Sequence, residues 1–204
     1  MGRRRGYSVD AVVTAARDAF WERGYEGAAV SDLEAATGLS RSSLYQAFGS
    51  KQQLFVQALD AYIRGFIDPL LCPLESETAG ASSVEDFVRR LVDLFREEGL
   101  PSRCGCLWAN SIAGLGRDQL SQADIRAAEY WDRLYRAFSN GLRQAQPLER
   151  RGLSPQEHRA RLLAVSTFAA WLIVPVDPER ALGVCEAMLA DIHSWRQSSA
   201  AARR

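Results

Sequence analysis

The sequence predicts an all-α protein of about nine helices, and three features support that class. Apolar residues recur at helical spacing through most of the 204 residues. Serine or aspartate caps open many of these runs, and glycine or proline closes them. We find no run of alternating apolar and polar residues that would indicate a strand. The composition, 47% hydrophobic and 25% charged, is typical of a folded globular protein.

Three short helices are predicted at the start of the chain. The first is expected to follow a Ser8 cap and to bury Val12, Ala16, Ala19 and Phe20. Ser31 and Glu34 suggest a capping box for the second helix, which Gly38 would end. Ser40 is expected to cap the third helix, whose inner side carries Leu44, Ala47 and Phe48. Ser50 is expected to cap the helix that follows.

Two short helices joined by a glycine turn, the second with a polar outer face, form the helix-turn-helix pattern. A helix of that size fits the major groove of DNA. Ordinary helical hairpins share this geometry, so the pattern alone leaves both interpretations open. The candidate base-reading and backbone-contacting side chains on this helix are Ser40, Arg41, Ser42, Ser43, Tyr45 and Gln46. By analogy with homeodomain arms, the basic arm of Arg3, Arg4 and Arg5 is expected to reach a phosphate or a minor groove.

Specific residues in this region resemble the amino-terminal module of the TetR family of bacterial transcriptional regulators. The matching positions are Ala29 and Val30, Gly38, Leu44-Tyr45-x-x-Phe48, Ser50 and Lys51, Leu54 and Phe55, preceded by Ala15, Ala16, Ala19, Phe20, Gly24 and Tyr25. The resemblance covers about residues 9–60. It implies a DNA-binding domain at 1–50 and a ligand-binding and dimerisation domain at 51–204, with 51–71 as the linking helix. It also implies that Lys51 contacts a phosphate.

The resemblance further implies a repressor that binds a palindromic operator as a homodimer and is released by a small apolar or aromatic inducer. Double-stranded operator DNA, the inducer and a second copy of the chain are therefore the expected partners. A formal net charge of zero is compatible with this function, because the basic residues can be locally concentrated.

The rest of the chain is expected to be helical as well. A continuous apolar stripe from Lys51 to about Leu71 predicts one long helix, which Pro69 and Pro73 would end. Further helices are predicted from Ser82, from Asp118 to about Ala145, from Ser154 to Val174, and from Asp177 onward. Ser154, Pro155 and Glu157 supply a cap, a first-turn proline and a capping-box acid.

The last two predicted helices are apolar on more than one face. Such helices near a chain terminus often complete their burial in a second subunit, as a four-helix bundle. Burial in a single core is the alternative. The predicted interface residues are Leu162, Val165, Phe168, Ala169, Leu172, Met188, Ile192 and Trp195.

A ligand pocket is expected among the central helices, lined by aromatic side chains with a few polar groups that orient the ligand. Aromatic residues at helical spacing are also typical of plain core packing, and that alternative stays open for each of them. The candidate lining residues are Phe66, Phe87, Leu91, Phe95, Trp108, Asn110, Ser111, Trp131, Tyr135 and Trp171.

Cys104 and Cys106 suggest a second mechanism of regulation. The segment Gly105-Cys106-Leu107 followed by Asn110 resembles one found in a subset of the family, some of whose members sense oxidants or electrophiles. Cys106 is expected in the first turn of a helix, near Arg103, which would favour the thiolate form. A small, inert packing residue is the alternative.

Other classes of protein are disfavoured by what the sequence lacks. It contains no glycine-rich phosphate loop and no G-x-S-x-G motif, and His158 and His193 are isolated, so neither an enzyme nor a cofactor or metal site is predicted. A purely structural helical scaffold would not explain the Leu44-Tyr45-x-x-Phe48 segment beside a basic arm. We find no run of about 18 apolar residues and no leader pattern, so we expect a cytoplasmic protein.

Overall fold

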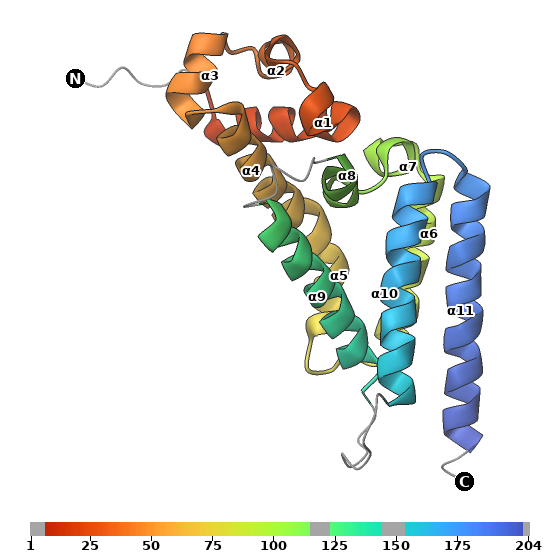
Figure 1. Cartoon of the computed structure of the whole chain (residues 1–204). Coiled ribbons are helices and arrows are strands. Elements are labelled where there is room, and N and C mark those ends of the chain that lie inside the picture. The colour runs from red at the N-terminus through yellow and green to blue at the C-terminus, as the bar shows by residue number, and fades with distance from the viewer. Residues whose placement is uncertain (1–6, 115–122, 144–153, 202–204) are drawn as a thin grey trace. The chain divides into compact units, whose positions relative to one another are not determined.

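The computed structural model describes residues 7–114, 123–143 and 154–201, and all regular structure in these ranges is helical, which confirms the predicted class (Figure 1). The helices are α1 (Val9–Gly27), α2 (Val30–Thr37), α3 (Arg41–Phe48), α4 (Lys51–Tyr62), the π-helix η1 (Ile63–Ile67), α5 (Asp68–Glu75), α6 (Ala81–Arg96), α7 (Leu100–Cys104), α8 (Leu107–Gly114), α9 (Ala123–Gly141), α10 (Pro155–Ile173) and α11 (Pro178–Ala201).

The chain divides into two compact units. Unit 1 comprises Met1–Ile67 and Cys106–Asp124, and unit 2 comprises Asp68–Gly105 and Ile125–Arg204. Unit 1 therefore contains α1 to η1 together with α8, and unit 2 contains α5 to α7 and α10 to α11 with most of α9.

The core of unit 1 is built around α1, which contacts α2, α4 and α8. Ser8 caps α1 as predicted, because its hydroxyl accepts from the Ala11 N–H at 3.4 Å. Val12, Ala16 and Phe20 are buried, and the Phe20 ring meets the Phe55 ring edge-on at 5.0 Å. Burying a side chain such as Phe20 contributes about 2 kcal/mol, so these contacts anchor α1 to α4.

The start of α2 differs from the prediction. The helix begins at Val30 with Ala29 as its N-cap, and the Asp32 carboxylate accepts from the Ala29 N–H at 2.9 Å. The proposed Ser31 cap is therefore wrong. The Asp32 carboxylate binds the N–H of the cap residue, which is the role that the serine pattern assigns to Glu34, so the serine pattern places the helix start too late.

The linking helix continues past the predicted stop. α4, η1 and α5 are contiguous from Lys51 to Glu75, and Leu70, Leu71 and Leu74 are buried in α5. The expectation that Pro69 and Pro73 end the helix is therefore wrong, because Pro73 also lies inside α5. Pro69 is the second residue of α5, directly after the π-helical turn, and a proline in the first turn of a helix loses little backbone hydrogen bonding.

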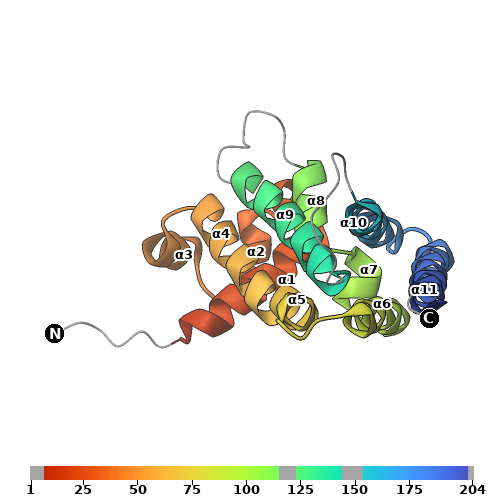
Figure 2. The ribbon, with the colours of Figure 1, turned by 90° about the horizontal axis from the view of Figure 1, so that it is seen from below.

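In unit 2, α10 and α11 run antiparallel and lie side by side, with α6 against α11 (Figures 1 and 2). The predicted capping box at the start of α10 is confirmed. Ser154 Oγ accepts from the Glu157 N–H at 3.2 Å, and Glu157 Oε2 accepts from the Ser154 N–H at 2.6 Å. The hydrogen bond from the Ser154 backbone lowers the pKa of the Glu157 carboxyl.

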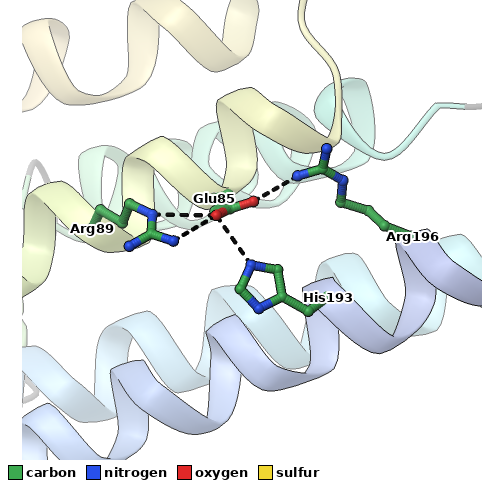
Figure 3. Close-up of polar contacts among 4 residues, drawn as sticks. All are labelled: Glu85, Arg89, His193 and Arg196. Carbon is green, nitrogen blue, oxygen red and sulfur yellow. Dashed lines mark hydrogen bonds and ion pairs between the residues drawn. The ribbon is translucent and has the colours of Figure 1, made fainter.

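A polar cluster joins α6 to α11 across this interface (Figure 3). Glu85 of α6 accepts from Arg89 of the same helix and from Arg196 Nη1 of α11 at 2.6 Å, and its Oε1 lies 3.0 Å from His193 Nε2. The hydrogen bonds from Arg89 and then from His193 lower the pKa of Glu85 to about 2. The Glu85 carboxylate therefore links the two helices and stays charged at neutral pH.

The turn between α7 and α8 requires glycine. Gly105 has a φ of +69°, a left-handed conformation, and a Cβ built there would lie 2.3 Å from the Trp171 carbonyl oxygen. Any side chain at this position would collide with the backbone of α10.

Candidate nucleic-acid interface

The α2–turn–α3 segment has the geometry of a helix-turn-helix. Gly38 ends α2 in the left-handed conformation with a φ of +68°, as predicted. Ser40 caps α3, and its Oγ accepts from the Ser43 N–H at 3.3 Å. Leu44 and Phe48 bury the inner side of α3 at 3% and 6% exposure, which fixes its outer face toward solvent.

The outer face of α3 presents the side chains that the sequence proposes for DNA. Arg41, Ser42 and Gln46 are exposed, and Ser43 and Tyr45 are half-buried. The hydroxyls of Ser42 and Ser43 each lie 3.0 Å from Ser40 Oγ, so the three serines form one hydrogen-bonded group at the start of the helix. These hydroxyls are thereby held in place before any ligand arrives.

Glu34 holds the start of α3 in a way that the sequence analysis missed. Its Oε1 accepts from the Arg41 backbone N–H at 2.6 Å, seven residues along the chain. The sequence pattern instead suggests a capping box between Glu34 and Ser31. A contact between one helix and the start of the next depends on the turn geometry, so no spacing rule within a single helix reveals it.

Two basic side chains beside α3 lie over aromatic rings. Lys51 Nζ lies 4.6 Å from the centroid of the Tyr25 ring, and the Arg41 guanidinium lies 5.5 Å from that of Tyr45. Such cation–π contacts limit the freedom of the side chain while leaving its charge available. Burial raises the pKa of the Tyr25 phenol. Arg3, Arg4 and Arg5 lie outside the described residues.

Comparison with known proteins identifies the module. Residues 12–58 match the model of the bacterial regulatory proteins of the tetR family. The uncharacterized HTH-type transcriptional regulator YezE of Bacillus subtilis (strain 168) is 31% identical over 150 residues, which are 71% of this chain and 73% of YezE. The chain belongs to the TetR family. As a TetR-family protein it is a DNA-binding transcriptional regulator.

Two further relatives extend the comparison. The HTH-type transcriptional repressor ComR of Escherichia coli (strain K12) is 31% identical over 121 residues, which cover 57% of this chain and 55% of ComR. A cysteine mutant of the TetR-family transcriptional regulator CifR, complexed with 26-base-pair operator DNA, superposes with a TM-score of 0.73 at 28% identity. That match covers 92% of this chain and 98% of the CifR chain, so the TetR fold extends through both units.

The residues proposed for a dimer interface fall into two groups. Leu162, Val165 and Leu172 are exposed large apolar side chains on α10, at 67%, 53% and 39%. Phe168, Ala169 and Trp195 are half-buried. Met188 and Ile192 are instead buried in their own subunit at 4% and 0%, because they face inward from α11, so their part in the proposed interface is wrong.

The residues proposed for a ligand pocket are divided between the two units. In unit 2, Phe87, Leu91, Phe95 and Trp171 are buried, and Phe95 packs edge-on against Trp171 at 4.9 Å. Trp131 is 36% exposed and Tyr135 is half-buried. In unit 1, Trp108 is buried, and Phe66 and Asn110 are half-buried. The buried Ser111 hydroxyl donates to the Leu107 carbonyl at 2.6 Å, a bond within α8.

Unit 2 contains an open cavity of about 650 Å³. Of the proposed pocket residues only Tyr135 lines it. Most of its lining residues are of polar or charged type, and they come from α5, from α9 with the residues that follow it, and from α10: Glu75, Arg133, Tyr135, Arg136, Ala137, Ser139, Asn140, Arg143 and Glu157.

The four cysteines differ in exposure. Cys72 is exposed, Cys104 is half-buried, and Cys106 and Cys185 are buried. Cys106 lies just before α8 rather than in its first turn, and the Tyr62 hydroxyl donates to its sulfur at 3.3 Å. Burial raises the pKa of the Cys185 thiol to about 11.

The described part of the chain holds no group of three or more histidine, cysteine or acidic residues that could bind a metal. Within the same residues no helix is long and apolar enough to cross a membrane.

Proposed function

We propose that this protein is a ligand-responsive repressor that binds a palindromic operator as a homodimer. In this proposal residues 1–50 bind DNA and residues 51–204 bind the inducer and dimerise, and the chain catalyses no reaction. The observation that carries it is the exposed polar face of α3, with Arg41 and Lys51 beside it. The inner side of the same helix is buried and holds that face outward. The name of ComR as a repressor and the CifR complex with operator DNA support it.

Each subunit would place α3 in the major groove. Ser42, Ser43 and Gln46 would read base edges, and Lys51 and Arg41 would contact phosphates. Two such helices related by a two-fold axis read a palindrome when they lie about one DNA turn, 34–36 Å, apart. The basic arm of residues 3–5 would add contacts in the minor groove.

Dimerisation would use the outer face of α10. Three exposed large aliphatic side chains on one helix are costly in water, and a second copy of the same face would cover them. Half-buried residues of α10 and α11, including Trp195, would complete a four-helix bundle.

Release from DNA would follow from binding of a small apolar or aromatic inducer. The linking helix contains the π-helical turn η1 at the end of unit 1, and π-helical turns are often found at functional sites. An inducer that binds one arrangement of the linking helix better than the other shifts the distance between the recognition helices. Both cannot then contact their half-sites.

The decisive test replaces Lys51. We expect Lys51→Ala to weaken binding to all DNA and to reduce the slope of log K against log salt by about 0.9 per subunit, one phosphate each. Lys51→Arg keeps the charge and serves as the matched control. Fragments that the wild type selects from genomic DNA in a gel shift provide the operator. If Lys51→Ala leaves affinity and slope unchanged, α3 is not placed on DNA as proposed.

A second candidate function is a thiol-based repressor that uses Cys106 to sense an oxidant or electrophile. The hydrogen bond from Tyr62 to the Cys106 sulfur favours it, because a hydroxyl donor stabilises negative charge on sulfur. The burial of Cys106 opposes it, because a reagent must reach the sulfur. We therefore favour the non-covalent inducer.

A further inference from the structure

Side chains of the same unit bind two of the first N–H groups of α3, those of Arg41 and Ser43. Ser40 Oγ accepts from the Ser43 N–H, the Ser40 carbonyl oxygen accepts from the Leu44 N–H at 2.9 Å, and Glu34 Oε1 accepts from the Arg41 N–H at 2.6 Å. The acceptor from Glu34 carries a full negative charge, whereas the others are neutral. A carboxylate at a helix amino terminus interacts favourably with the partial positive charge there.

This arrangement bears on how α3 meets DNA. Free N–H groups at a helix amino terminus bind phosphate well, and in a recognition helix they would attract the DNA backbone of any sequence. Here the Arg41 N–H is already occupied, and the carboxylate repels a phosphate that approaches the same end. This arrangement favours contacts between α3 and DNA through the outward side chains of α3.

Glu34 also fixes α3 relative to α2. Its hydrogen bond spans the Gly38 turn and joins the middle of α2 to the first residue of α3. Base contacts need side chains held in one geometry, while nonspecific backbone contacts tolerate a helix that moves.

We propose that Glu34 is a specificity-determining residue. It positions the recognition helix α3 and keeps DNA phosphates from binding at the amino terminus of α3. The inference rests on the proposed DNA-binding function. Glu34 weakens binding to arbitrary DNA more than binding to the operator, because nonspecific binding depends on phosphate contacts alone, whereas the operator complex also has base contacts that reward the fixed geometry. The ratio of operator to nonspecific affinity is larger as a result.

The test compares Glu34→Gln, Glu34→Ala and the wild type on the selected operator fragment and on a scrambled fragment of equal length, over a salt series. The glutamine side chain would keep the acceptor and remove the charge. In water, repulsion between the carboxylate and one phosphate roughly 10 Å away weakens binding about twofold, so removing the repulsion from a few phosphates should tighten binding to scrambled DNA about threefold to tenfold. Operator affinity should change less. Glu34→Ala should tighten scrambled-DNA binding similarly and also weaken operator binding, because the acceptor is lost.

Glu97→Gln is the matched control, because it removes one charge from an exposed residue at the end of α6 in unit 2. It should leave the affinity ratio at the wild-type value. Far-UV circular dichroism of Glu34→Gln should match the wild type, so a lost fold cannot explain a lower ratio. If Glu34→Gln keeps the wild-type ratio and salt slope, the inference is wrong. If the wild type itself selects no fragment, the proposed function fails instead.

Discussion

The cluster around Glu85 allows a quantitative prediction about stability. Its carboxylate is 14% exposed and has three cationic or hydrogen-bonding partners, two of them on α11 (Figure 3). The change Glu85→Gln removes the charge and keeps the shape. This substitution therefore tests whether the carboxylate stabilises the contact between α6 and α11 or contributes nothing to stability.

The expected magnitude follows from the partners. An exposed i,i+4 pair such as Glu85 with Arg89 contributes about 0.3–0.5 kcal/mol, and partly exposed pairs between helices contribute up to about 1 kcal/mol each. Glu85→Gln should therefore cost about 1–2 kcal/mol of unfolding free energy at pH 7. Arg89→Ala should cost only about 0.3–0.5 kcal/mol, because its bond lies within α6. Arg196→Ala should cost more, because its bond at 2.6 Å joins the two helices.

The effect should depend on pH in one direction. The pKa of Glu85 is lowered from 4.5 to about 2, first by the hydrogen bond from Arg89 and then by that from His193. A carboxyl whose pKa is lower in the folded state stabilises the fold above its unfolded pKa and loses that contribution as the pH falls through the folded one. The difference between wild type and Glu85→Gln should be complete above about pH 5 and should shrink steadily toward pH 2.

Urea unfolding, followed by circular dichroism at several pH values and one fixed protein concentration, measures this difference. Thermal scans should show a loss of about 3–6 °C for Glu85→Gln at pH 7. Equal stability of the variant and the wild type at pH 7, or a difference that does not shrink on acidification, would refute the assignment.

Two further predictions concern assembly and regulation. Leu172→Glu should be monomeric in light scattering at micromolar concentration, because the dimer would bury a charge in an apolar interface. Leu172→Ala should remain dimeric, and a monomeric wild type would remove the basis of the dimer proposal. Iodoacetamide should modify the exposed Cys72 before the buried Cys106, as mass spectrometry can show, and Cys106→Ser should still release the operator with inducer. Faster modification of Cys106, with an operator response lost in Cys106→Ser, would instead support the thiol sensor.

The helical class, the family and the course of α3 could be predicted from the sequence because they depend on local rules. Ser40 as a cap, Gly38 at a left-handed position and Leu44 with Phe48 on one face each involve residues within a few positions of one another. Interactions at that range have nearly the same geometry in any context. The capping box at Ser154 was predictable for the same reason.

Local rules were insufficient where two signals competed. Asp32 and Ser31 both suit a helix start, and Ala29 is the cap because the Asp32 carboxylate accepts from its N–H. Pro69 should stop a helix, yet the buried Leu70, Leu71 and Leu74 continue it after the π-helical turn. Apolar burial contributes more than a proline costs in a first turn.

Contacts between distant residues were decided by the tertiary structure alone. The sequence alone indicates that helices form, where most of them lie and which face of α3 is polar. It did not show that Glu34 caps the next helix, that Glu85 meets His193 and Arg196 more than 100 positions away, or that Met188 turns inward. The apolar pattern of a helix shows that a face is buried, but the partner that covers it depends on how the whole chain packs.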